Sequence, residues 1–222
     1  MSKIWYLSPS SQNANIGVGN YGSEQAQMNL LTDAIIPHLD RAGVSFHRAD
    51  PGLTLAQRVK ESNEMGTAFH LALHSNAGGK GLARGPVAYY YSQAGKELGE
   101  KLVAALLALG QENNRSSNVK QEKTFYELKS TRAPACLLEV DFHDSPSGVE
   151  FLMNRREEIA ESIAKVIIAA DGKQFVPLTQ GEHIDEAVRL GLFPRNTQWN
   201  APMTKEETAI LAVKLLKLIK RG

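Results

Sequence analysis

Short apolar runs alternate along this chain with longer stretches in which apolar residues recur every three or four positions. A run of four to eight apolar residues fits a buried strand, and spacing by three and four is typical of an amphipathic helix. Strands that alternate with helices form a mostly parallel sheet with helices packed on its faces. The sequence therefore predicts an α/β fold with a twisted, mostly parallel sheet and helices on both faces.

The boundaries of the expected elements follow from the same patterns. Strands are expected at 4–7, 44–47, 69–74, 87–91 and 135–142, and helices at 23–39, 54–65, 97–109 and 147–170. Thr54 with Gln57 and Ser147 with Glu150 have the spacing of a capping box, which predicts where two helices begin. The polar stretch 111–121 has no period and is expected to be irregular.

The composition changes after Asp171. Residues 172–181 carry glycine, proline and polar residues without helical spacing, which predicts a linker. The chain then divides into a large domain, 1–171, and a small helical module, 182–222. About forty residues with few core positions are marginal alone, so this module is expected to dock on the large domain or to pair with a second copy.

Charge and cysteine content exclude several classes of protein. A formal net charge of +1 gives no electrostatic reason to expect a nucleic acid partner. The single cysteine, Cys136, can form no internal disulfide. No apolar run approaches the ~18 residues of a membrane span, and the first residues lack the pattern of a secretory signal. We therefore expect synthesis in the cytoplasm without membrane insertion, and the oligomeric state stays open.

A glycine pattern suggests one alternative function. Gly17, Gly19 and Gly22 fit GxGxxG before a predicted helix, as in dinucleotide-binding sites. In those sites the first glycine directly follows the strand, because the pyrophosphate must meet the helix N-terminus. Here nine residues separate Leu7 from Gly17. A polar loop over a site is therefore the favoured interpretation.

Four side chains lie at the ends of predicted elements, where an open α/β sheet collects its functional groups. They are Glu24, His74, Glu139 and His143. Two histidines and a carboxylate commonly bind a catalytic zinc ion, and a further carboxylate can move the proton of the attacking water. A carboxylate in an apolar strand is costly to desolvate, so Glu139 needs a functional explanation. His70 would lie about 13 Å from His74 along a strand and is expected to be structural.

Several segments together carry a resemblance to a known family. The segments IWYLSPS, YGSEQAQMN, LAQRVKESN, LHSNAGG and STRAPACLLEVDFHD resemble, in order and spacing, the zinc-dependent N-acetylmuramoyl-L-alanine amidases of the third amidase family. The resemblance covers roughly residues 3–171. It implies a twisted, mostly parallel sheet, and hydrolysis of the bond between the lactyl group of muramic acid and the first alanine of peptidoglycan. It also implies that Glu24 and His74 bind zinc and that Glu139 is the catalytic carboxylate.

The chain departs from this family at the usual first zinc ligand. The family has a histidine in the turn after the first strand, whereas this chain has Ser8-Pro9-Ser10-Ser11-Gln12 there. We predict that His143 replaces the missing ligand, provided that the chain turns after Asp141. Asp141 itself and a degenerate or different site are the alternatives.

The predicted function is therefore a zinc amidase that degrades cell-wall peptidoglycan. A chain without a secretory signal resembles phage endolysins, which act on the wall during host lysis once the membrane is opened. The module 182–222 faintly resembles half of a surface-layer homology motif, which favours wall binding over dimerisation. A non-catalytic wall-binding relative and a dinucleotide enzyme using Gly17–Gly22 remain the alternatives, and the substrate-binding residues stay unassigned.

Overall fold

The computed structural model describes residues 3–78 and 80–177, and within them six strands form one sheet in the order β2-β1-β3-β6-β4-β5. Neighbouring strands are parallel except for β4 and β6, which are antiparallel. The predicted, mostly parallel sheet is therefore confirmed. The strands are β1 (Ile4–Pro9), β2 (Ser45–Arg48), β3 (Phe69–Asn76), β4 (Val87–Tyr90), β5 (Val119–Gln121) and β6 (Ala135–Phe142).

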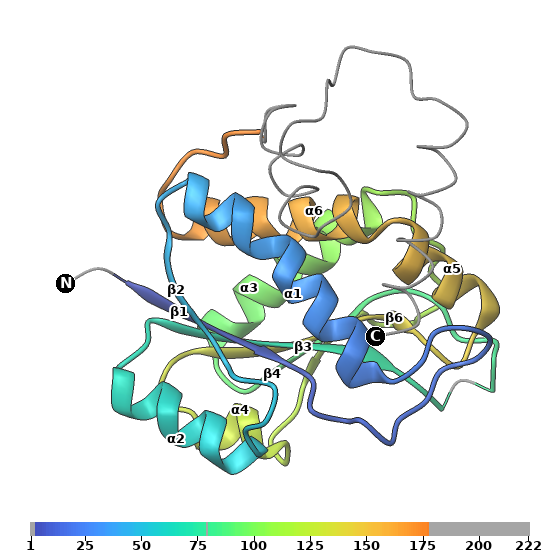
Figure 1. The fold of residues 1–222 in the computed structure, drawn as a ribbon, viewed down its shortest axis with the longest axis horizontal. Coiled ribbons are helices and arrows are strands. Elements are labelled where there is room, and N and C mark those ends of the chain that lie inside the picture. Colours follow the sequence, from blue (N-terminus) through green and yellow to red (C-terminus); the bar gives the residue numbers. More distant parts are fainter. Residues whose placement is uncertain (1–2, 79, 178–222) are drawn as a thin grey trace, which may run out of the picture. The chain divides into compact units, whose positions relative to one another are not determined.

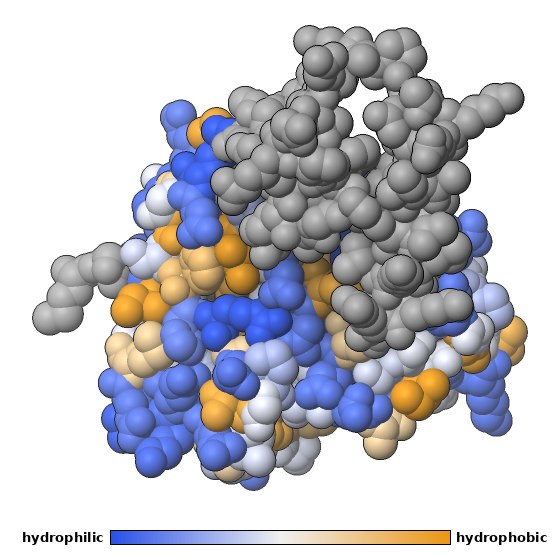
Figure 2. All heavy atoms as spheres, viewed as in Figure 1, coloured by the Kyte–Doolittle hydropathy of each residue, from blue (hydrophilic) through white to orange (hydrophobic). Residues whose placement is uncertain are grey.

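Helices cover both faces of this sheet, as the alternating pattern predicts. In Figure 1, α1, α3 and α6 lie above the sheet, and α2 and α4 lie below it. The surface over α2 is mostly hydrophilic (Figure 2). The helices are α1 (Glu24–Arg41), α2 (Leu55–Met65), α3 (Gln93–Leu107), α4 (Tyr126–Ser130), α5 (Pro146–Asn154) and α6 (Arg156–Ala170).

The two faces of the sheet are packed differently. The large apolar core lies between the sheet and the helices α1, α3 and α6, with contributions such as Leu7, Ile35, Leu102 and Ile163. The described residues of the other face contribute a second cluster of only four buried apolar residues, Ala72, Leu128, Ala135 and Leu137. Polar side chains therefore fill much of the space between the sheet and the helices α2 and α4.

Three expectations about local structure were wrong. The stretch 111–121, expected to be irregular, contains β5, and the short helix α4 was not expected at all. The predicted last helix is two helices, because the chain leaves helical geometry at Arg155. The first of the two, α5, has Ser145 as its N-cap, and the Ser145 side chain accepts a hydrogen bond from the backbone of Gly148. The predicted cap at Ser147 is therefore two residues late. Periodicity cannot detect elements of three to five residues, and Pro146 fits the first turn after a cap at Ser145.

Residues just beyond the predicted domain limit also belong to the sheet domain. The compact unit extends to Val176. Asp171 accepts a hydrogen bond from the indole of Trp5 (3.3 Å), and Phe175 packs against His38 and the Lys165 ammonium. The predicted module 182–222 and most of the predicted linker lie outside the described residues. Within the described ranges, no helix is long and apolar enough to cross a membrane.

Candidate active site

Glu24, His74 and Glu139 meet at the end of the two central strands. His74 of β3 and Glu139 of β6 are register partners in neighbouring parallel strands. Glu24 is the first residue of α1, where the Ser23 side chain caps the helix by accepting from Ala26 N. The expectation that strand ends and a helix start would collect these groups agrees with this arrangement.

Glu24 and His74 are in direct contact. Oε1 of Glu24 lies 2.7 Å from Nδ1 of His74, yet this buried oxygen has no partner with hydrogen-bond geometry. Burial opposes the charged forms of both groups, but their mutual attraction prevails. The pKa of Glu24 is lowered by His74, Ser10 and Asn15, and the pKa of His74 is raised to about 9 by Glu24 and Glu139. Glu24 and His74 therefore form an ion pair.

Glu139 lines a cavity beside this pair. The cavity has a volume of about 280 Å³, and Gln12, His74, Tyr126 and Glu127 are among its other lining residues. Desolvation by burial raises the pKa of Glu139 to about 7, with a further rise from Glu24 and an opposing effect of His74. Its Oε2 is buried without a hydrogen-bond partner. Glu139 is therefore a carboxyl group beside the cavity whose pKa burial raises toward neutral pH.

Gln12 is a site residue that sequence analysis missed. It belongs to the turn in which the resembling family has its first histidine, and its Nε2 lies 3.4 Å from Nδ1 of His74. The turn is fixed by two contacts, since Ser10 N donates to Leu73 O and Arg58 donates to Pro9 O. The sequence did hold a signal for Gln12, namely the missing histidine. A residue in that turn is expected to lie close to Glu24 and His74.

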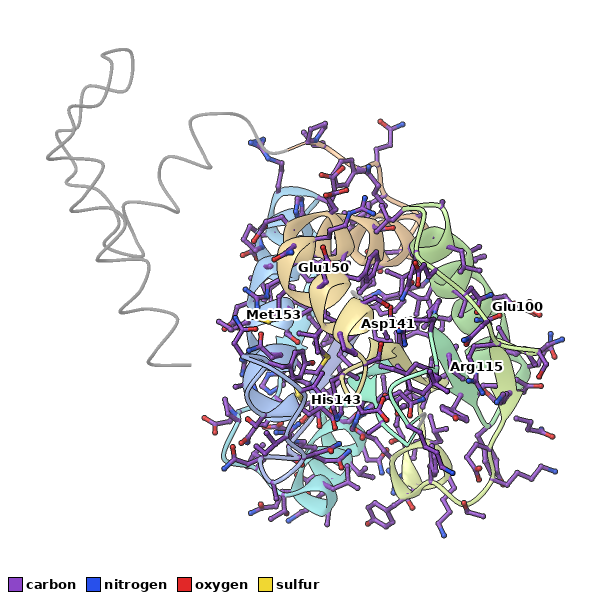
Figure 3. All side chains as sticks on the ribbon, turned by 90° about the vertical axis from the view of Figure 1, so that its right-hand side faces the viewer. Glu100, Arg115, Asp141, His143, Glu150 and Met153 are labelled. Carbon is purple, nitrogen blue, oxygen red and sulfur yellow. The ribbon has the colours of Figure 1, made fainter. Side chains whose placement is uncertain are left out.

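His143 lies close to this group but behind another side chain. Its Nε2 is 3.1 Å from Asn15 Oδ1, and Asn15 Nδ2 donates to Glu24 Oε2 (2.6 Å). Its Nδ1 is 2.8 Å from the hydroxyl of Ser75. The structure therefore brings His143 to Glu24 through Asn15, a residue that sequence analysis did not select. In Figure 3, His143 lies below Glu150 and Met153 of α5, and Asp141 lies to the right of Met153.

Asp141, the second candidate ligand, is engaged elsewhere. Its Oδ1 accepts from the backbone of Gly85 (3.1 Å) and Phe142 (2.7 Å), and its Oδ2 accepts from Gln111 (2.7 Å). It shares no contact of this kind with Glu24 or His74. Asp141 thus holds the loop at Gly85 against the end of β6.

The donor atoms of Glu24 and His74 fit a metal ion in part. A buried carboxylate oxygen without a hydrogen bond, beside an imidazole nitrogen, is the donor pair that zinc accepts. Among the described residues, no three His, Cys, Asp or Glu side chains are grouped to hold a metal ion. The Gln12 side chain lies next to His74. Its carboxamide oxygen is a neutral and therefore weaker metal ligand than a carboxylate or an imidazole. Two ligands therefore fit, and the identity of a third is the open question.

The glycine loop does not offer a phosphate site. Gly17 N donates to Gly22 O (2.9 Å), and Val18 N donates to His143 O (2.9 Å). A dinucleotide site needs free amides at this position, next to the helix N-terminus. The loop packs against His143 instead, through the bond from Val18 N.

His70 is structural, as its distance from His74 predicts. It is fully buried, and its Nε2 lies 2.8 Å from Oε1 of Glu127, a residue of the unexpected helix α4. Its Nδ1 lies 3.0 Å from the Ser62 hydroxyl of α2. These buried polar contacts join β3, α2 and α4.

Comparison with known proteins finds a matching family and solved structures with the same fold. The family model described as N-acetylmuramoyl-L-alanine amidase matches residues 15–169. No curated protein shows a significant sequence match. Among solved structures, the catalytic domain of the N-acetylmuramoyl-L-alanine amidase CwlV from Bacillus (Paenibacillus) polymyxa var. colistinus is similar, with a TM-score of 0.68 and 18% identity over 78% of this chain and 99% of that one.

Two further structures have the same fold. An N-acetylmuramoyl-L-alanine amidase of Nostoc punctiforme gives a TM-score of 0.67 at 19% identity, covering 76% of this chain and 96% of that chain. The catalytic domain of an endolysin targeting Clostridia difficile gives 0.64 at 19% identity, covering 76% and 98%. At these identities the likeness establishes the fold.

Proposed function

The chain belongs to the N-acetylmuramoyl-L-alanine amidase family, and we propose that it hydrolyses the amide bond between N-acetylmuramoyl and L-alanine of peptidoglycan in a zinc-dependent reaction. The observation that carries this proposal is the convergence of Glu24, His74 and Glu139 at one end of the sheet, beside a cavity. These are the groups that such a hydrolysis requires.

Glu24 and His74 are proposed to hold the metal through Oε1 and Nδ1. Bound there, zinc would supply Lewis acidity, which activates water near neutral pH and polarises the amide carbonyl. Asn15 holds the other carboxylate oxygen of Glu24, Oε2, so only Oε1 faces His74. That His143 is the third ligand stays a prediction, since its ring nitrogens face Ser75 and Asn15.

Glu139 is proposed to accept the proton of the attacking water and to deliver it to the alanine nitrogen as that nitrogen leaves. A general base works best with a pKa near the working pH, and burial raises that of Glu139 to about 7. The cavity of about 280 Å³ beside it leaves room for the scissile amide.

The first experiment separates the metal from the general base. Purified Glu139→Gln protein is expected to bind zinc like the unaltered chain but to release amino groups from purified walls about 10³-fold more slowly. His74→Ala protein should lose both zinc and hydrolysis. Glu150→Gln, an exposed change on α5, is the control and should alter neither.

The outcomes distinguish the remaining alternatives. An unaltered chain that binds no zinc and releases no amino groups would support the non-catalytic wall-binding alternative. Glu139→Gln protein that hydrolyses walls at the unaltered rate would exclude the proposed role of Glu139.

We also propose a role in host lysis after synthesis in the cytoplasm. Similarity to an endolysin catalytic domain supports this role, while the similar bacterial amidases make an autolysin the alternative. Bacteria that produce the chain internally should lyse when a permeabilising agent opens the membrane, and Glu139→Gln producers should not. Lysis of both strains at the same rate would contradict an enzymatic cause.

A further inference from the structure

An unbroken chain of hydrogen-bonding side chains runs from a buried tyrosine to the Glu24 carboxylate. The Tyr21 and Ser75 hydroxyl oxygens are 2.7 Å apart, and Ser75 Oγ is 2.8 Å from Nδ1 of His143. Nε2 of His143 is 3.1 Å from Asn15 Oδ1, and Asn15 Nδ2 is 2.6 Å from Glu24 Oε2. His143 is the third of the five members.

The carboxylate fixes the direction of the two hydrogen bonds nearest to it, and a neutral His143 ring fixes the direction of the other two. An ionised Glu24 only accepts hydrogen bonds, so the NH₂ group of Asn15 must face it. Asn15 Oδ1 then faces His143, and Nε2 of His143 must carry the proton. Nδ1 is left to accept from the Ser75 hydroxyl, which in turn accepts from Tyr21. Burial lowers the pKa of His143, in agreement with a neutral ring that has one N–H.

The ring of His143 is held in place on all sides. It is fully buried and stacks on the Tyr21 ring, with centroids 5.4 Å apart and planes at 14°. Its backbone N donates to Asn76 O (2.8 Å), and its carbonyl accepts from Val18 N (2.9 Å). A Cβ at Gly17 would collide with the Tyr21 ring and lie 2.8 Å from the His143 carbonyl. The glycine loop therefore packs against the Tyr21 ring and the His143 backbone.

We infer that His143 is a positioning residue, which acts on Glu24 through Asn15. By donating from Nε2, it keeps the Asn15 amide turned so that one Glu24 oxygen is held and Oε1 stays directed toward His74. This inference rests on the proposed zinc-dependent function, and it gives His143 a role other than that of a direct ligand. Partners that orient a ligand in this way commonly change metal affinity 10- to 100-fold.

A double-mutant cycle on zinc affinity tests the inference in the full chain. His143→Phe keeps the stacked ring and removes both ring nitrogens, and Asn15→Ala removes the link. Each should weaken zinc binding by about 10- to 100-fold, measured by competition with a chelator. The double variant should be no weaker than the weaker single variant, within about threefold, because both remove the same connection. Asn13→Ala, an exposed change in the same loop, is the control.

Two results would overturn the inference. If His143 is a direct ligand, His143→Phe will lose stoichiometric zinc while Asn15→Ala retains it. If the two residues act independently, their fold-changes will multiply in the double variant. His143→Gln can still donate to Asn15 and should recover affinity to within about threefold of the unaltered chain. If His143→Phe does not fold, as judged by the lack of a cooperative unfolding transition, the zinc affinity of His143→Gln is compared with that of Asn15→Ala instead.

A metal-free measurement separates this inference from the proposed function. Nitrogen NMR of His143 in the metal-free chain should show the neutral tautomer with the proton on Nε2, and Asn15→Ala should change its signals. A proton on Nδ1, or no response to Asn15→Ala, overturns the positioning role. Absence of zinc binding by the unaltered chain would instead overturn the zinc-dependent function and leave the tautomer result to judge the positioning role.

Discussion

Gln12 belongs to the turn that lacks the expected histidine, and its amide Nε2 lies 3.4 Å from Nδ1 of His74. A neutral carboxamide binds zinc more weakly than imidazole, so this residue is expected to limit metal affinity. Gln12→His should therefore tighten zinc binding about tenfold or more, a change of only about 1.4 kcal/mol. Competition with a chelator measures the affinity.

The control for this prediction is Asn13→His, which places an imidazole on the next, exposed residue of the same turn. It should leave zinc affinity unchanged. Equal gains from both changes would mean that any added histidine in the turn recruits metal, and the assigned place of Gln12 in the site would be wrong.

The short helix α4 brings an exposed aromatic ring to the rim of the cavity. Tyr126 is 44% exposed and lines the cavity together with Glu139. An exposed aromatic ring at a site favours contact with a ligand. Tyr126→Ala should raise the KM for soluble wall fragments several-fold and leave kcat and zinc content unchanged, the pattern of lost uniform binding. Lys129→Ala on the same helix is the control, and a loss of kcat without a change in KM would argue against a binding role.

The same helix contributes a pH-dependent contact to the fold. Burial alone would raise the pKa of Glu127, but its bond with His70 prevails and lowers it. A carboxylate with a lowered pKa stabilises the fold above its unfolded pKa of about 4.5, and this stability is lost as the pH falls through the lower folded value. Glu127→Gln should therefore cost about 2 kcal/mol at pH 7 and progressively less below about pH 4.

Denaturant unfolding at pH 7 and pH 3 measures this difference. The matched control is Glu64→Gln, which alters the exposed pair of Lys60 and Glu64 on α2 and should change stability little at either pH. A cost for Glu127→Gln that is equal at both pH values would show that the charge of Glu127 does not stabilise the fold.

The elements also show what the sequence can and cannot predict. The long apolar strand β6 and the capping box at Thr54 and Gln57 are local signals, and the structure has both where they were expected. Strand β5 depends on pairing with β4, and α4 on a buried contact of Glu127 with His70, so no local period reveals them. The gathering of Glu24, His74 and Glu139 follows from parallel topology. The link through Asn15 depends on loop packing, which spacing along the chain does not encode.

At the scale of the whole molecule, the residues that follow α6 stabilise the sheet domain. Asp171 binds the Trp5 indole, Lys173 contacts the Gly43 carbonyl, and Phe175 packs against the core. A protein ending after Val176 should therefore unfold with nearly the same midpoint as the sheet domain in the full chain. A protein ending after Ala170 loses all three contacts, worth about 2 kcal/mol, and should unfold about 4–8 °C lower.

The protein ending after Val176 also tests the predicted wall-binding role of residues 182–222. Because Glu24, His74 and Glu139 all lie before Val176, the protein 1–176 should keep zinc and hydrolyse soluble wall fragments at the rate of the full chain. On intact walls it should be retained less in a sedimentation assay, since the basic residues Lys214, Lys217 and Lys220 are removed with the module. Equal retention of both proteins would exclude wall binding by the module, and measuring the mass of the full chain in solution would then test the alternative that the module pairs two copies.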